Sequence, residues 1–293
     1  MKNYEELTFT DDFMFCKTLQ ENEDLCKELT ELVLGRKIGR IVKTEKQKSV
    51  EMTADGHGVR FDVYFEDDDS TVYDIEMQRS DTKELPLRSR YYQGMIDLDY
   101  LEKGHKYQEL PDSYIIFLCV FDLFQQGYHK YSFRAMCNEV PGLYLKDNAN
   151  RVFICAGGEK DDVSNDMKSF IDYLVGCTPS SDLTERIEKK VKEAIALSLW
   201  RKEYMTYREH MEEQFNIGRE EGYEAGMEIG LKEGKEAGLK EGKEAGLKDG
   251  KDQINMLNSI LIEAGRIDDL KKATTDTAFQ KKLIDELLPA NMQ

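Results

Sequence analysis

Asp62, Glu76 and Gln78 are the residues whose types and spacing in this sequence could perform chemistry. Each lies in a run of alternating apolar and polar residues, and such runs are typical of β-strands, whose side chains alternate between two faces. Two carboxylates on adjacent strands, near a third oxygen ligand, suit Mg²⁺, a hard cation that needs few protein ligands and keeps several waters. Whether Asp62 faces Glu76 depends on the register of the strands, which the sequence leaves open.

A β-hairpin over residues 58–80 is expected to carry these residues, with an acidic turn at 67–70 between its strands. One face of the first strand is predicted to hold Val59, Phe61, Val63 and Phe65. One face of the second is predicted to hold Tyr73, Ile75 and Met77, and the opposite face Val72, Asp74, Glu76 and Gln78. Acidic residues on a hairpin are often simply solvated, so an exposed face without function is the alternative.

The order of these residues resembles a known nuclease pattern. An Asp on one strand, then Glu-x-Gln on the next, then a helix, resembles the PD-(D/E)xK nuclease superfamily. The wording VRFDVYFED…VYDIEMQ is most similar to the Rpn family of recombination-promoting nucleases, also called PD-(D/E)xK nuclease family transposases, and the likeness covers residues 5–140. It implies metal-dependent hydrolysis of DNA phosphodiester bonds, with Asp62, Glu76 and Gln78 as catalytic residues. It also implies that Asp62, Glu76 and the backbone carbonyl of Met77 hold Mg²⁺, with Mn²⁺ as a possible substitute.

Gln78 departs from the superfamily pattern, which has lysine at this position. Glutamine can hydrogen-bond to water but cannot neutralise charge, so the rate of such an enzyme is left open. Two functions follow. The first is a Mg²⁺-dependent DNA endonuclease, which the resemblance links to recombination, mobile elements or phage defence. The alternative is a catalytically weak or inactive nuclease-fold protein that acts as an oligomeric assembly or interaction module.

A first helix is predicted over residues 8–35, capped by Thr10 and ended by Gly35. Its segment DDFMF resembles the family's Asp-x-x-Phe start, with Asp12 and Phe15 as the matching pair. The resemblance implies that Asp12 is an additional metal ligand. The alternative is a helix-end charge that interacts favourably with the helix dipole.

Residues 36–48 form a basic segment in an otherwise acidic chain and suggest the first strand. Lys43, Lys46 and Lys48 are expected to contact DNA phosphates, with a solvated strand edge as the alternative. Arg88, near the start of a second helix predicted over 83–104, is a further candidate phosphate contact. For Arg88 the alternative is a surface salt bridge.

The elements predict an α/β fold with a restriction-endonuclease-like αβββαβ core and a mixed sheet. Residues 113–121 are a continuous apolar run, which is typical of a strand buried on both faces. Further strands are predicted over 130–137 and 151–155. Helices are predicted over 163–175 and 183–200. A nuclease-like domain is therefore expected to span residues 1–200.

Nine glycines recur every four residues from Gly218 to Gly250, within a charged helical region expected over 201–252. Glycine costs about 0.8–1 kcal/mol relative to alanine in a helix, so nine cost roughly 7–9 kcal/mol and an isolated helix is marginal. A second copy of the chain could supply the missing contacts, which predicts a homo-oligomer. A flexible tether is the alternative. Residues 253–293 are expected to form a small C-terminal helical module.

The composition limits partners and location. The net charge of −17 argues against a simple electrostatic nucleic-acid binder, although metal ions and a local basic patch leave a nuclease possible. The six cysteines form no CxxC pair, which favours free thiols in a reducing cytoplasm. The first 13 residues lack a signal-peptide pattern, and no apolar run reaches the 18 residues that a membrane span needs.

Overall fold

A six-stranded mixed sheet forms the centre of the first of two compact units, which comprise Met1–Arg208 and Glu209–Gln293. The computed structural model describes residues 2–46, 49–50, 59–101 and 106–288. The strands lie in the order β1 (Ile41–Lys46), β4 (Val63–Asp67), β5 (Val72–Gln78), β6 (Ser113–Cys119), β8 (Ala149–Cys155) and β7 (Lys130–Phe133). The central strands β5, β6 and β8 are parallel, and the remaining pairs are antiparallel. A separate antiparallel pair is formed by β2 (Ser49–Val50) and β3 (Val59–Arg60).

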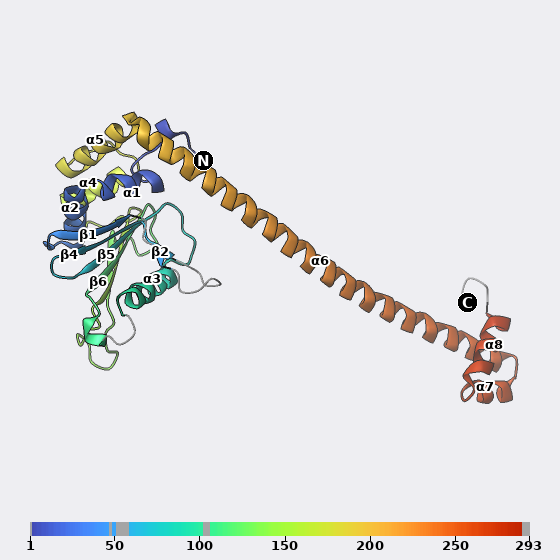
Figure 1. Ribbon diagram of the computed structural model, residues 1–293. Coiled ribbons are helices and arrows are strands. Elements are labelled where there is room, and N and C mark those ends of the chain that lie inside the picture. The colour runs from blue at the N-terminus through green and yellow to red at the C-terminus, as the bar shows by residue number, and fades with distance from the viewer. Residues whose placement is uncertain (1, 47–48, 51–58, 102–105, 289–293) are drawn as a thin grey trace. The chain divides into compact units, whose positions relative to one another are not determined.

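Helices cover both faces of this sheet (Figure 1). One face carries α1 (Asp12–Gln20), α2 (Glu23–Leu34), α4 (Asn165–Leu174) and α5 (Asp182–Ala196), and the other carries α3 (Leu85–Tyr100). Two short 3₁₀ helices are η1 (Tyr4–Glu6) and η2 (Tyr107–Glu109). The predicted mixed α/β architecture is confirmed, and helix, strands, helix and strand follow one another in the expected order.

Each face of the sheet has its own apolar core. Strand β6 contributes to both, because Ile116 and Leu118 pack under α1 and α2 while Ile115 and Phe117 pack under α3. All four side chains are fully buried. A strand covered on both faces needs no polar positions, which explains its continuous apolar run.

The predicted alternation through residues 59–65 is wrong. Val63 and Phe65 pack in the core beneath α1, whereas Val59 and Phe61 pack in the core beneath α3. The chain leaves the strand conformation at Phe61 and Asp62, between β3 and β4. Because this break resets the pleat, side chains on its two sides face opposite cores. The expected acidic turn between β4 and β5 is present, with Ser70 at a φ of 58°.

The single first helix predicted over 8–35 is also wrong. It is divided into α1 and α2 at Glu21 and Asn22. Asn22 takes the N-cap position of α2, and its Nδ2 donates to the carbonyl oxygen of Thr18 at 2.8 Å. This local hydrogen bond competes with continuation of the helix. Gly35, at a φ of 72°, ends α2 as expected.

Helix α3 buries Met95 but only part of its remaining apolar surface. Leu87 and Leu98 are 60% and 53% exposed, whereas Leu85, Tyr92 and Ile96 are buried against the sheet. The helix has apolar residues on two faces, and contact with β6 rather than spacing decides which one is buried. Its predicted end at Gly104 lies outside the described residues. Near the end of the first unit, the helix predicted over 183–200 divides into α5 and α6 (Ser198–Glu263).

The second unit comprises most of α6 together with α7 (Ile267–Ala273) and α8 (Thr277–Leu287). All nine repeat glycines lie within α6. A small core joins the end of α6 to the last two helices through Leu257, Leu261, Ala273, Leu283 and Leu288. Gly265, at a φ of 73°, makes the turn before α7. Among the helices described, none is long and apolar enough to cross a membrane.

Candidate active site

Asp62 and Glu76 meet where β4 begins and β5 ends. The backbone N–H of Asp62 donates to Glu76 Oε1 at 3.0 Å, and the backbone N–H of Met77 donates to Asp62 Oδ2 at 3.2 Å. The register of the two strands, with Val63 opposite Ile75, places Asp62 opposite Glu76. Their exposed fractions are 8% and 2%, so these acids do not lie on a solvated face.

Helix α1 brings three polar side chains to Asp62. Asp12, Cys16 and Gln20 are four residues apart, a spacing that places them on one face of a helix. A carboxylate oxygen of Asp12, the sulfur of Cys16 and a carboxylate oxygen of Asp62 all lie within 4.8 Å of one another. Gln20 Nε2 donates to the carbonyl oxygen of Asp62 at 2.8 Å. Sequence reasoning missed Cys16 and Gln20, and their four-residue spacing from Asp12 was the available signal.

The negative charges in this cluster are crowded. Burial raises the pKa of Asp62 well above its ordinary value, and the charges of Glu76 and Asp12 raise it further. Burial likewise raises the pKa of Glu76, with the charge of Asp74 as the next cause. The pKa of the Cys16 thiol is raised well above its ordinary value, chiefly by burial and then by the charge of Asp62, so the thiol stays protonated at neutral pH.

Asp74 adds a further buried carboxyl on the same face of β5 as Glu76. It is fully buried, and within the described parts of the chain no hydrogen-bond donor reaches either of its oxygens. Its pKa is raised well above the ordinary value by burial and then by the charge of Asp62. A buried carboxyl without a donor is far more stable as the neutral acid.

Arg88 reaches this cluster from α3. Its guanidinium donates to Gln78 Oε1 at 3.0 Å, to Glu76 Oε2 at 3.2 Å and to the Tyr92 hydroxyl at 2.8 Å. Gln78, 9% exposed, therefore has a fixed cation beside its amide. The salt bridge expected as the alternative for Arg88 is present, and its partner Glu76 is buried rather than on the surface.

The remaining four predicted residues differ in what the structure shows of them. Met77 donates its N–H to Asp62, and a role for its carbonyl as a metal ligand stays a prediction. Lys43 is exposed on β1, at the edge of the sheet. The backbone of Lys46 pairs with Val63, next to Asp62, but its side chain is not described. Lys48 lies outside the described residues.

The donor atoms of this cluster fit a hard divalent cation. Asp12, Asp62 and Glu76 offer carboxylate oxygens, the ligand type that Mg²⁺ and Mn²⁺ prefer. The protonated thiol of Cys16 is a poor ligand for such an ion. A cation bound here would also offset the crowding that raises the pKa values of Asp62 and Glu76.

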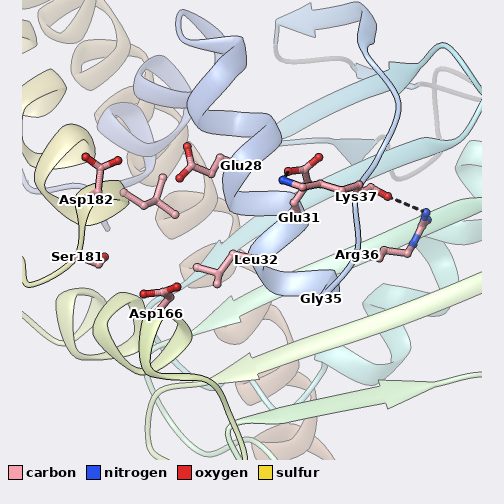
Figure 2. A pocket seen from close by; sticks show the side chains of 10 residues that line it. Glu28, Glu31, Leu32, Gly35, Arg36, Lys37, Asp166, Ser181 and Asp182 are labelled. Carbon is pink, nitrogen blue, oxygen red and sulfur yellow. Dashed lines mark hydrogen bonds and ion pairs between the residues drawn. The ribbon is translucent and has the colours of Figure 1, made fainter.

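A cavity of about 460 Å³ lies elsewhere in the first unit, between α2 and the start of α5 (Figure 2). Its lining includes Glu28, Glu31 and Asp182, and none of the predicted site residues. Another cavity, of about 690 Å³, is lined by Arg79 and Val120, which directly follow β5 and β6. This second cavity lies beside two strand ends, but none of the cluster residues lines it.

Comparison with protein families gives one match. A family model described as PD-(D/E)XK nuclease family transposase matches residues 10–156, which is half of the chain. The matched range includes all the members of the cluster: Asp12, Cys16, Gln20, Asp62, Asp74, Glu76, Gln78 and Arg88. Comparison with curated proteins and with solved structures found no match.

Proposed function

The chain belongs to the PD-(D/E)XK nuclease family transposases, and from this we propose that it is a Mg²⁺-dependent DNA endonuclease. The observation that carries the proposal is the carboxylate group within the matched residues, formed by the buried Asp62 and Glu76 together with the partly exposed Asp12. Burying carboxylates together is costly unless a cation compensates them, so such a group is expected at a functional site.

Asp62, Glu76 and Asp12 would hold the cation, with the Met77 carbonyl as an additional ligand. When bound there, Mg²⁺ or Mn²⁺ would supply Lewis-acid chemistry, by which the scissile phosphate would be polarised and the pKa of the attacking water lowered. The hydrogen bonds between Asp62 and strand β5 keep Asp62 and Glu76 together. Gln20 supports them by binding the backbone of Asp62.

Arg88 offers the positive charge that Gln78 lacks. Its guanidinium cannot be deprotonated near neutral pH, and three hydrogen bonds hold it beside Glu76 and Gln78. In the proposed enzyme, Gln78 orients water through its amide, and Arg88 stabilises charge that develops on the phosphate. This division of roles supports a catalytic site without the lysine of the superfamily pattern.

DNA is the proposed substrate, and the local charges support contact near the cluster. The chain has a net charge of −17, so DNA must meet a locally basic surface. We propose Lys43 for this surface, since it lies on β1, which pairs with β4 as far as Val63 next to Asp62, and contact of Lys46 and Lys48 with DNA stays a prediction from the sequence. A cytoplasmic role in recombination, mobile elements or phage defence is the biological context that we propose.

The test is a nicking assay on supercoiled plasmid with the full chain in Mg²⁺, Mn²⁺ or EDTA. We expect nicking with either metal and none with EDTA. Asp62→Ala and Glu76→Ala should each lower the rate at least about 100-fold, equivalent to about 2.7 kcal/mol of transition-state stabilisation. Circular dichroism should show that both variants remain folded.

Asp69→Ala is the matched control. Asp69 is an exposed acid in the turn of the same hairpin, at the end of β4 and β5 away from Glu76, so this change should leave the rate unaltered. Nicking by a folded Asp62→Ala protein at the wild-type rate would place the active site elsewhere. A wild-type protein that cuts with neither metal would favour the non-enzymatic assembly function.

A further inference from the structure

The first turns of α6 pack on the N-terminal segment of the first unit. Tyr204 is buried, its ring centroid lies 5.2 Å from that of Phe13, and its hydroxyl donates to the carbonyl oxygen of Lys2 at 2.8 Å. Nearby, Arg201 forms an ion pair with Glu5 at 2.5 Å. These contacts fix one face of α6 against the start of α1.

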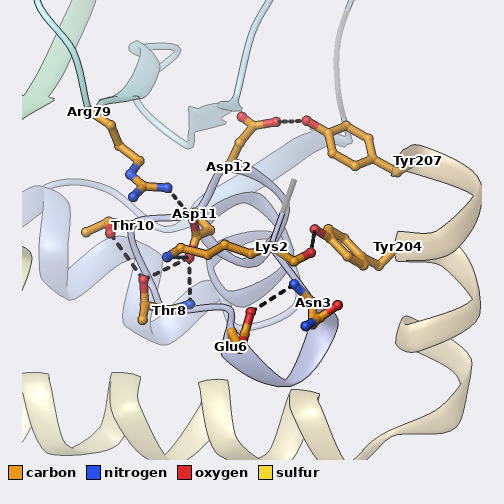
Figure 3. A network of polar contacts seen from close by, with 10 residues as sticks. All are labelled: Lys2, Asn3, Glu6, Thr8, Thr10, Asp11, Asp12, Arg79, Tyr204 and Tyr207. Atoms are coloured by element: carbon orange, nitrogen blue, oxygen red, sulfur yellow. Dashed lines mark hydrogen bonds and ion pairs between the residues drawn. The ribbon is translucent and has the colours of Figure 1, made fainter. Parts of the chain in front are cut away.

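Tyr207, one turn further along α6, reaches the candidate metal site (Figure 3). Its hydroxyl donates to Asp12 Oδ2 at 2.5 Å, and Arg60 Nη2 donates to the same oxygen at 3.3 Å. The Arg60 guanidinium also lies 6.0 Å from the centre of the Tyr207 ring. Burial and then the charge of Asp12 raise the pKa of Tyr207, so its hydroxyl remains a donor at neutral pH.

Asp12 needs such a partner more than the other acids of the cluster. Its side chain is 39% exposed, whereas Asp62 and Glu76 are almost completely buried. An exposed carboxylate on a helix can turn toward water. Two donors on Oδ2 restrict that rotation and hold the group within 4.8 Å of an Asp62 oxygen.

We propose that Tyr207, assisted by Arg60, is a positioning residue that holds Asp12 in place to bind the catalytic cation. This role rests on the proposed function, because it requires Asp12 to be a ligand of that cation. Hydrogen-bonding partners of metal ligands orient the ligands, and their loss weakens metal affinity by about 10–100-fold. At the start of α6, Tyr204 would then hold the helix against the N-terminal segment, and Tyr207 would position a ligand of the metal site.

Tyr207→Phe and Tyr204→Phe make a matched pair, because each removes one hydroxyl from the same helix. Only the Tyr207 hydroxyl contacts Asp12, while the Tyr204 hydroxyl contacts the backbone of Lys2. Isothermal titration calorimetry with Mn²⁺ on the full chain measures the effect without turnover. We expect a Kd at least about 10-fold weaker for Tyr207→Phe and a Kd within about twofold of wild type for Tyr204→Phe.

A double-mutant cycle with Asp12→Ala separates positioning from general loss of structure. If Tyr207 acts through Asp12, Tyr207→Phe should not weaken the Kd further once Asp12 is gone. An equal loss in that background, a wild-type Kd for Tyr207→Phe, or tighter binding would each overturn the positioning role. If wild type binds no Mn²⁺, or Asp62→Ala binds it normally, the proposed metal site fails and the positioning role fails with it.

Discussion

At the scale of single residues, Asp62 shows how a few hydrogen bonds hold a buried carboxylate in place. Its backbone N–H, its carbonyl oxygen and its carboxylate are each used by a different partner: Glu76, Gln20 and Met77. These bonds fix the carboxylate in a site from which water is largely excluded. The same burial makes its ionised form unfavourable, which is the cost that a bound cation would offset.

Asp62→Asn should therefore stabilise the cation-free protein, and more so at higher pH. Folding raises the pKa of Asp62, so its stabilising protonated form is fully present below the unfolded pKa near 4 and is lost as pH rises through the folded pKa. Asparagine carries no charge and escapes this loss. We expect the Tm gain of the variant over wild type, measured in EDTA, to be larger at pH 8.5 than at pH 5.5.

The gain should amount to a few degrees, since each kcal/mol shifts Tm by roughly 2–4 °C in a protein of this size. Asp69→Asn, in the exposed turn, is the control and should give the same Tm difference at both pH values. A Tm gain for Asp62→Asn that is equal at pH 5.5 and pH 8.5 would show that burial does not raise the pKa of Asp62.

At the scale of elements, the contact between β5 and α3 places a positive charge beside the position at which the superfamily pattern has a lysine. At position 78, β5 carries a glutamine amide where the superfamily pattern has a lysine ammonium group. Arg88 of α3 donates to the oxygen of this amide. The helix thereby contributes the cation that the strand lacks. A lysine at position 78 would have no acceptor for Arg88 and would place two positive charges together.

Gln78→Lys, although it restores the residue of the wider superfamily, should thus impair this protein. We expect about a 10-fold lower nicking rate in Mg²⁺, equivalent to about 1.4 kcal/mol, together with a lower Tm. Adding Arg88→Ala to Gln78→Lys should recover part of both losses, because it removes the repulsion. A Gln78→Lys protein as active as wild type would show that the Gln78–Arg88 contact has no catalytic role.

At the scale of the whole molecule, the two units differ in how they are stabilised. The first has two cores around a sheet, whereas most of the second is a helix whose side chains are exposed. Around its repeat glycines, apart from the adjacent residues and backbone of α6 itself, no described residue comes within 4 Å of where a Cβ would stand. Large apolar side chains on this part of α6 are also exposed, namely Phe215, Tyr223, Leu231, Leu239 and Leu247. Since packing stabilises most protein helices, a helix with this composition favours a partner.

We expect a second copy of the chain to be that partner, so the full chain should be a homo-oligomer. Light scattering at micromolar concentration should give a mass at least twice 34.0 kDa for the full chain. A shorter chain ending at Arg208, where the first unit ends, should run as a monomer. This end point keeps Tyr204 and Tyr207, which an end at Trp200 would remove. If the full chain and the shorter chain are both monomers, the homo-oligomer prediction is wrong and the glycine repeat is a tether.

Local periodicity was enough for the sequence to determine several features. Glu76 and Gln78 share a face of β5 because strand side chains alternate, and β6 is buried on both faces because its positions from Ile115 to Cys119 are all apolar. Pro86 lies in the first turn of α3 and Gly35 ends α2 because backbone geometry restricts these residue types to such places. Each of these features depends only on neighbouring residues.

Only the tertiary structure decided which of these faces meet. Because of the break at Phe61 and Asp62, the side chains of Val59 and Phe61 and those of Val63 and Phe65, which were expected on one face, enter different cores. No local sequence pattern marks this break. Tyr207 reaches Asp12 across 195 residues of chain, and Arg88 reaches Glu76 from the next helix. A repeating pattern says which side of an element is apolar, but the packing of distant elements selects its partner. The candidate site is assembled by that packing, so the sequence could name Asp12, Asp62, Glu76 and Arg88 as candidates, but not the contacts that Cys16, Gln20 and Tyr207 make with the acids.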